Sequence, residues 1–177
     1  YSIAKYSAYN YLKYFNTNFK MFCCSAFFFN HESKLRDQRF ITRKIINKLK
    51  FPNKYRLLAL NNIEDLVDWG HAHDYMKAAY KIIKQRMPSH EIIATGKNYK
   101  LKYFIELSCK YLDIKYKWLI KNKQIYLKDI KNKRILLKSE IKKNNKKIKI
   151  KIKKTKNKLN WEPYYKFNDI VKEMCFN

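Results

Sequence analysis

Apolar residues recur at helical spacing in several segments, which alternate with short apolar runs. Residues 1–18 carry aromatic and aliphatic side chains without proline or glycine, which predicts a helix. The mostly apolar segment Met21–Phe29 predicts a buried strand, and the polar segment Asn30–Arg39 predicts a loop. Further helices are expected over Phe40–Lys50, Asp74–Arg86 and Leu101–Leu112, with short strands at Tyr55–Leu60 and His90–Ala94. Strands that alternate with helices predict an α/β fold.

The pattern changes after Ile114. Short β-like pieces separated by Lys and Asn clusters follow at Ile114–Leu119, Gln124–Leu127 and Ile135–Leu137. Lysine is concentrated in residues 142–158, and strict Lys/Ile alternation over Lys147–Lys153 favours an amphipathic strand with a solvated lysine face; the alternative is a strip that binds nucleic acid or membrane. Asn168–Phe176 predicts a short final helix. We expect residues 1–113 to form one region with interleaved segments of the lobe, and residues 114–177 to form an appended lobe with the C-terminal helix.

Composition excludes several classes of protein. Gly70 and Gly96 are the only glycines, so a glycine-rich phosphate loop of the GxGxxG kind has no place in this chain and must lie elsewhere. The longest apolar run is far shorter than the roughly 20 residues of a membrane span, and no secretion signal opens the chain. The four cysteines show no CxxC spacing, which predicts reduced structural thiols, no zinc site and a cytoplasmic location.

The net charge of +27 would ordinarily indicate a polyanionic partner. The excess, however, is nearly all lysine, and it accompanies abundant Asn, Ile, Tyr and Phe, all residues with AT-rich codons. Drift in base composition explains this profile on any fold. We therefore do not expect nucleic acid to be a partner, although a basic nucleic-acid-binding protein remains the alternative.

Tyr1 and Lys5 are four positions apart, so on a helix both polar groups lie on one face. A neighbouring ammonium favours the phenolate and lowers the pKa of a tyrosine, which can then act as a general base. Such pairs also arise by chance in a chain this rich in Tyr and Lys, so the pair alone carries little weight.

Other motifs follow the Tyr/Lys pair in a specific order. They are NHES at Asn30–Ser33 with Arg36 and TRK at Thr42–Lys44, DWGHAHDY at Asp68–Tyr75, IATG at Ile93–Gly96 and LNWEP at Leu159–Pro163. Together with YSIAK at the start, this series resembles the C-terminal half of the GDP-mannose 4,6-dehydratases, which are extended short-chain dehydrogenase/reductases. The resemblance implies the C-terminal part of an NAD(P)-binding Rossmann-like fold with a small α+β substrate-binding lobe.

The resemblance also implies roles for single residues. Tyr1 would be the catalytic base, and Lys5 would lower its pKa and hold the nicotinamide ribose of NADP. His31 and Arg36 would bind the cofactor, whereas Asn30, Lys44 and Glu140 would bind the substrate, GDP-mannose. Asp68, Trp69 and His71 would shape the loop beneath the site; Trp69 and Trp161 are most simply core anchors, and His71 and His73 hydrogen-bonded scaffold residues. Assembly as a homo-oligomer is expected.

The implied reaction oxidises C4 of the hexose, eliminates water across C5 and C6, and returns the hydride to C6, so NADP is regenerated. The family's Thr and Glu for the elimination precede the tyrosine, which predicts that the chain is a fragment of a longer protein and is inactive alone. Several matched positions depart from the pattern: Lys34 and Leu35 replace Pro-Arg, Asp37 replaces Gly, and Val67 and Leu137 replace arginines. An inactive relative that retains only the fold is therefore a further alternative.

Overall fold

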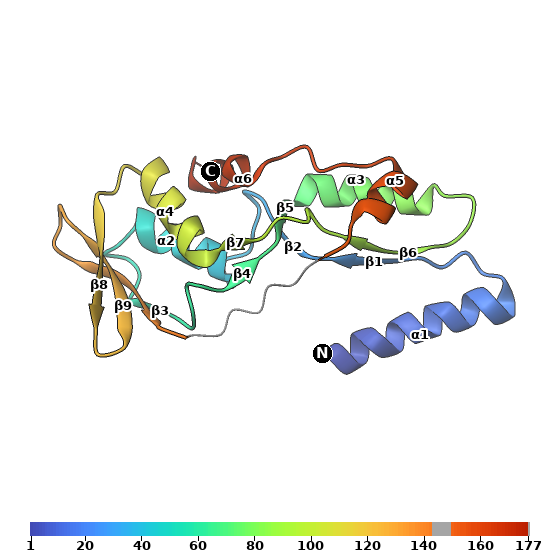
Figure 1. Cartoon of the computed structure of the whole chain (residues 1–177), viewed down its shortest axis with the longest axis horizontal. Helices are drawn as coiled ribbons and strands as arrows, with labels where there is room; N and C mark the ends of the chain where they lie inside the picture. Colours follow the sequence, from blue (N-terminus) through green and yellow to red (C-terminus); the bar gives the residue numbers. More distant parts are fainter. Residues whose placement is uncertain (143–149, 177) are drawn as a thin grey trace.

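The computed structural model describes residues 1–142 and 150–176 and has a mixed α/β architecture (Figure 1). The helices are α1 (Ser2–Phe19), α2 (Ile41–Lys50), α3 (Ala72–Ile83), α4 (Leu101–Tyr111), α5 (Lys153–Leu159) and α6 (Phe167–Phe176). The strands are β1 (Ser25–Phe28), β2 (Asn30–Glu32), β3 (Leu58–Leu60), β4 (Leu66–Val67), β5 (Trp69–His71), β6 (His90–Ile93), β7 (Tyr99–Lys100), β8 (Tyr116–Lys121), β9 (Gln124–Asp129) and β10 (Ile135–Glu140). In the described part of the chain, no helix is both long and apolar enough to cross a bilayer.

Strands β1 and β6 form a parallel pair in which Ser25 lies opposite His90. Figure 1 shows α3 and α5 on one side of this pair and α1 on the other. A small core fills the space under α3 and α5; its buried members are Tyr75, Ala78, Ile82, Ile93, Leu159 and Trp161. The prediction of a buried strand over Met21–Phe29 was wrong in length and in burial. Phe27 and Phe28 remain 42% and 38% exposed, and because successive side chains of a strand point to opposite faces, neither face of β1 is fully covered at these two residues.

The predicted extent of the first helix is confirmed by α1, but this helix contains no buried residue. It contacts the β1–β6 pair through Tyr9, whose ring meets Phe27 edge to face at 5.3 Å and His90 at 5.0 Å between ring centroids. The helix ends at Lys20, whose left-handed backbone lets its amide donate to the Phe15 carbonyl. The first helix is thus attached to the fold by these aromatic contacts and by Asn16, whose Nδ2 lies 3.4 Å from His90 Nε2.

A second sheet, in the order β3-β10-β9-β8, lies at the end of the molecule away from α1 (Figure 1). Strand β3 joins β10 in parallel, so a strand from the first region completes the sheet of the lobe. Helices α2, α4 and α6 bury their apolar faces with this sheet in one large core. Ile45, Ile46 and Leu49 on α2 have the i, i+1, i+4 spacing that places them on one helical face, as the sequence predicts.

Two short strand pairs connect the sheets. Asn30–Glu32, which lies in the segment predicted to be a loop, is strand β2 and pairs in parallel with β5. That prediction was wrong because the three polar residues gave no apolar alternation, and their strand geometry comes from the backbone of β5. The second pair is antiparallel and joins β4 to β7; β4 directly precedes β5 in the sequence.

The prediction of a strand over Lys147–Lys153, in the lysine-rich segment, is also wrong for the residues that the structure describes. Residues 147–149 lie outside the described residues, and Lys153–Leu159 is the helix α5. Ile152, Thr155 and Leu159 are buried at i, i+3, i+7 spacing, which is helical. Glu91 on β6 accepts hydrogen bonds from Thr155 at 3.0 Å and from Lys158 at 2.6 Å, so α5 docks on the strand through this buried carboxylate.

Candidate functional site

Two cavities flank strand β2, and five of the seven residues predicted for the site are divided between them. The first is a cavity of about 480 Å³ between α1 and β1. Tyr1, Lys5 and His31 line it together, so the residues singled out at the start of the chain do lie beside the histidine of the NHES motif. Lys5 Nζ is 5.4 Å from the centre of the Tyr1 ring, as expected for a pair four residues apart on a helix. Tyr1 is 95% exposed.

The His31 ring is fixed from behind. Its Nδ1 lies 3.0 Å from the Phe29 carbonyl oxygen, and because a carbonyl can only accept, Nδ1 carries the proton of this hydrogen bond. In the neutral ring, Nε2 then has a lone pair. The ring centroid is 5.3 Å from that of Tyr75, which is fully buried. Strand β2 and helix α3 thereby set the orientation of the imidazole in the first cavity.

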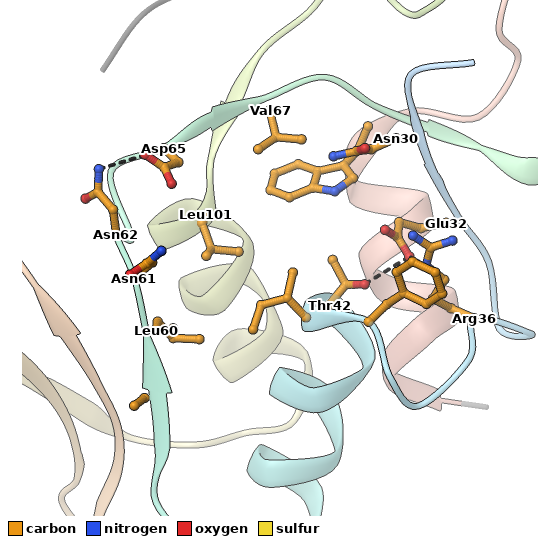
Figure 2. A pocket seen from close by; sticks show the side chains of 14 residues that line it. Asn30, Glu32, Arg36, Thr42, Leu60, Asn61, Asn62, Asp65, Val67 and Leu101 are labelled. Atoms are coloured by element: carbon orange, nitrogen blue, oxygen red, sulfur yellow. Dashed lines mark hydrogen bonds and ion pairs between the residues drawn. The ribbon is translucent and has the colours of Figure 1, made fainter. Parts of the chain in front are cut away.

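The second cavity, of about 380 Å³, lies on the other side of β2 (Figure 2). Asn30 and Glu32 line it, together with Arg36, Thr42 and Trp69. Residues Asn30 and Glu32 face this cavity and His31 faces the first because side chains of a strand alternate in direction. The predicted cofactor residues are therefore split: His31 lies with Tyr1 and Lys5, whereas Arg36 shares a cavity with the predicted substrate residue Asn30.

Glu32 is the buried acid of the second cavity, with 3% of its surface exposed. Thr42 Oγ1 donates a hydrogen bond of 2.9 Å to its Oε2, and Arg36 Nε forms an ion pair of 3.0 Å with the same oxygen. Burial raises the pKa of Glu32 to about 7, although Arg36, Thr42 and Arg43 all act to lower it. The sequence does not single out Glu32, because a polar segment predicts a loop and not a strand with alternating faces.

The segment that carries Arg36 is held by two residues that sequence reasoning also missed as structural anchors. Arg43 on α2 donates to the carbonyl oxygens of Lys34 and, at 3.2 Å, of Met174. Glu173 on α6 accepts from the Lys34 amide at 2.9 Å. The last helix of the chain therefore positions the loop between β2 and α2, a contact for which the sequence offers no local signal.

The DWGHAHDY motif contributes the scaffold under these cavities. Asp68 accepts hydrogen bonds from the Thr95 amide at 3.0 Å, from the Thr95 hydroxyl at 2.7 Å and from the Gly96 amide at 2.7 Å. It thereby joins the motif to the IATG segment. Trp69 and Trp161 are buried, as expected for core anchors. His71 accepts from the His73 amide and contacts Glu173, which is the hydrogen-bonded scaffold role expected for it.

Lys44 and Glu140, the other residues predicted to bind substrate, line neither cavity. Lys44 is exposed on α2. Glu140 is exposed at the end of β10, where it pairs with Lys142 at 3.1 Å. The structure does not bring these two residues together with Asn30, and their roles stay predictions.

Comparison with known proteins gives the same family as the motifs. A family profile described as GDP-mannose 4,6 dehydratase matches residues 1–174. A GDP-mannose 4,6 dehydratase from Dictyostelium discoideum is 37% identical over 120 residues, which are 67% of this chain and 34% of that protein. The human protein of that name is 28% identical over 180 residues, covering 98% of this chain and 48% of its own length.

Solved structures with the same fold are more distant in sequence. The structure of RMD from Pseudomonas aeruginosa complexed with NADPH superposes with a TM-score of 0.77 at 11% identity, covering 99% of this chain and 54% of that one. A UDP-glucose 4-epimerase from Thermotoga maritima superposes with a TM-score of 0.76 at 18% identity and covers 99% of this chain and 52% of its own. The predicted fold, part of an extended short-chain dehydrogenase/reductase, is confirmed. The chain spans about half the length of these structures, and between a third and a half of the two relatives above.

Proposed function

This chain belongs to the GDP-mannose 4,6-dehydratase family, and we propose that it forms the part of such an enzyme that carries the tyrosine base and a share of the nucleotide-sugar site. The observation that carries the proposal is the cavity shared by Tyr1, Lys5 and His31. The motif match predicts that these three residues lie in one site. They come from two separate elements, α1 and β2, so the sequence spacing alone does not bring them together. The proposed reaction is the conversion of GDP-mannose to its 4-dehydro-6-deoxy product with loss of water.

In the proposed reaction, Tyr1 takes the proton of the hexose 4-hydroxyl. The ammonium of Lys5, one helical turn away, stabilises the phenolate that Tyr1 must present. NADP, the proposed cofactor, supplies the hydride acceptor when it is bound. The cavity beside Tyr1 has room and a donor–acceptor edge at His31 for part of such a cofactor, whereas its pyrophosphate needs a glycine-rich cradle that the two glycines of this chain cannot build.

On the other side of β2, the second cavity offers polar groups for a nucleotide sugar. Asn30 presents an amide, which can both donate to and accept from sugar hydroxyls. Arg36 is the basic residue of this lining and meets a nucleotide phosphate there. We further propose a cytoplasmic location, which the four free thiols favour, and assembly as a homo-oligomer.

Val67 favours the competing interpretation, a relative that keeps only the fold. It lines the second cavity at a position where the family pattern has arginine. Leu137, which likewise replaces an arginine of the pattern, is 1% exposed in β10 and contributes to the core instead of to a site. The structure gives less support to nucleic-acid binding by the lysine-rich segment than the sequence alone does. Two of its lysines, Lys156 and Lys158 of α5, already form ion pairs with Glu162 and Glu91.

The test is turnover. The enzyme of which this chain is proposed to form a part is incubated with GDP-mannose and NADP, and the nucleotide sugars are followed by mass spectrometry for a product lighter by one water. We expect Tyr1→Phe to lower the rate by roughly 100-fold or more, since it removes the general base, while the exposed Tyr11→Phe leaves the rate unchanged. A protein that binds GDP-mannose without turning it over would favour the inactive relative.

A further inference from the structure

A buried carboxylate at the second cavity contacts the one basic residue of its lining. Glu32 is almost fully removed from water, and a charge in that position is costly unless it is paired and hydrogen-bonded. Its Oε2 receives both the Thr42 hydroxyl and the Arg36 Nε, so the ion pair and the hydrogen bond converge on one oxygen. An apolar side chain would fill this place without that cost. The acid therefore calls for an explanation beyond packing.

Arg36 is held from two sides. Glu32 Oε2 forms an ion pair at 3.0 Å with Nε, which is buried and has no hydrogen-bond partner among the described residues, and Phe40 lies against the flat face of the guanidinium with 3.4 Å between Cζ and the ring centre. The side chain is only 20% exposed, and Figure 2 shows it beside Glu32 at the rim of the cavity. The ion pair with Glu32 uses the Nε of Arg36. The two terminal nitrogens of the guanidinium can therefore donate to a ligand.

The cavity needs this cation in order to take an anion. Among the residues that line it, Arg36 is the single base, whereas Glu32 and Asp65 are acids. The family pattern would add an arginine at the position of Val67, and this chain has an apolar side chain there. Recognition of a phosphate in the second cavity thus depends on the placement of one guanidinium.

We propose that Glu32 is a positioning residue, which holds Arg36 so that its terminal nitrogens face the second cavity and bind a phosphate of a nucleotide. Glu32 itself does not touch the ligand. The inference rests on the proposed function for the nature of the ligand, which is either the GDP part of the substrate or the phosphates of the cofactor. The position of Arg36 relative to Glu32 does not depend on that choice.

A double-mutant cycle tests the inference. Affinities for GDP and for NADPH are measured by calorimetry on the unaltered protein, Glu32→Ala, Arg36→Ala and the double variant. If Glu32 acts through Arg36, Glu32→Ala lowers the affinity for one of the two nucleotides by about ten-fold. In the Arg36→Ala background the same change lowers that affinity by less than about two-fold. Glu32→Gln, which keeps an oxygen acceptor, restores part of the loss. The nucleotide that shows the coupling identifies the phosphate. Equal losses in both backgrounds, or no loss in either, would overturn the inference.

A second readout separates this inference from the proposed function. The Nε–H resonance of Arg36 in ¹⁵N NMR spectra reports its restraint without any ligand. We expect it to be protected from solvent exchange in the unaltered protein and in Asp37→Asn, an exposed acid on the same loop, and to lose that protection in Glu32→Ala. If neither nucleotide binds the unaltered protein, the proposed function of this cavity is wrong. Unchanged protection in Glu32→Ala would show instead that Glu32 does not position Arg36.

Discussion

Glu173 and His71, far apart in the sequence, meet at 2.9 Å between Oε2 and Nε2. His71 accepts from the His73 amide at Nδ1, so the neutral ring carries its proton on Nε2 and donates it to the carboxylate. The other oxygen of Glu173 accepts from the Lys34 amide. One acid on α6 thereby joins the DWGHAHDY motif to the loop that carries Arg36. Partial burial acts to raise the pKa of Glu173, but the Lys34 amide and His71 outweigh it and hold that pKa below its ordinary value.

Replacing Glu173 should therefore loosen the loop as well as the helix. We expect Glu173→Ala to lower the free energy of unfolding by about 1–3 kcal/mol, because two donors lose a charged acceptor. Hydrogen exchange of the Lys34 amide should accelerate. Glu162→Ala is the matched control: its side chain is 77% exposed and pairs with Lys156, so we expect less than about 1 kcal/mol. Equal effects of the two changes in urea titrations would contradict the anchoring role of Glu173.

The buried Glu32 should make the stability of the protein depend on pH. Burial raises its pKa from 4.5 to about 7 in the folded chain, so between these values the folded state binds more protons than the unfolded state. Stability contributed by this group is then complete below about pH 4.5 and falls as the pH rises towards 7. We expect Glu32→Gln to lack this decline and to be more stable than the unaltered protein at pH 8 by about 2–3 kcal/mol.

Unfolding free energies measured in urea from pH 5 to pH 8 check the prediction for Glu32. Parallel pH curves for the two proteins would show that this carboxyl group titrates as it does in water. Asp37→Asn, at an exposed ion pair with Arg39, is the control and should leave the curve unchanged over that range.

Tyr75 is a second position at which a substitution should stabilise the protein. Among the described residues its hydroxyl is buried without a hydrogen-bond partner, and burial raises the pKa of the phenol. Since an unpaired buried hydroxyl is costly, Tyr75→Phe should raise the free energy of unfolding by about 1 kcal/mol. The exposed Tyr80→Phe on the same helix should be within about 0.5 kcal/mol of zero. A clear loss of stability in Tyr75→Phe would mean that the hydroxyl has a bound water or another partner.

Asp68 is the strongest polar anchor of the scaffold, with three donors on one buried side chain. We expect Asp68→Ala to cost about 3 kcal/mol or more, since two backbone amides and a hydroxyl lose their acceptor together. Thr95→Val removes only the hydroxyl and should cost about 1 kcal/mol. Thermal unfolding of both variants measures the difference, and similar melting temperatures would indicate that the two amides find another acceptor.

Much of this fold could be predicted because its helices have apolar faces of their own. Helices α2, α3 and α4 were expected from periodicity alone, with differences at their ends. Strand β2 could not be predicted in this way, because its three residues are polar and gain strand geometry from pairing with β5. The alternation of Lys and Ile before α5 has the two-residue period of a strand and therefore predicts a strand. The buried residues Thr155 and Leu159 instead follow the period of a helix.

The site could be predicted only in part for the same reason. The spacing of Tyr1 and Lys5 indicated a shared face, and the motif series indicated His31 as their neighbour. The division of Asn30 and His31 between two cavities follows from strand alternation, which the loop predicted from the polar sequence does not include. Glu173 lies on the predicted final helix, Asn168–Phe176, and its link to Lys34 depends on tertiary packing.

The parallel pairing of β3 with β10 has a consequence for synthesis of the chain. Strands β8, β9 and β10 can assemble as neighbours through local turns, but β3 emerges from the ribosome long before its partner and must wait for it. Until β10 arrives, the apolar residues of β3 and α2 lack their sheet. During this period the exposed apolar surface of the nascent protein can bind chaperones or associate with other chains. Slower translation before β10 would lengthen the period.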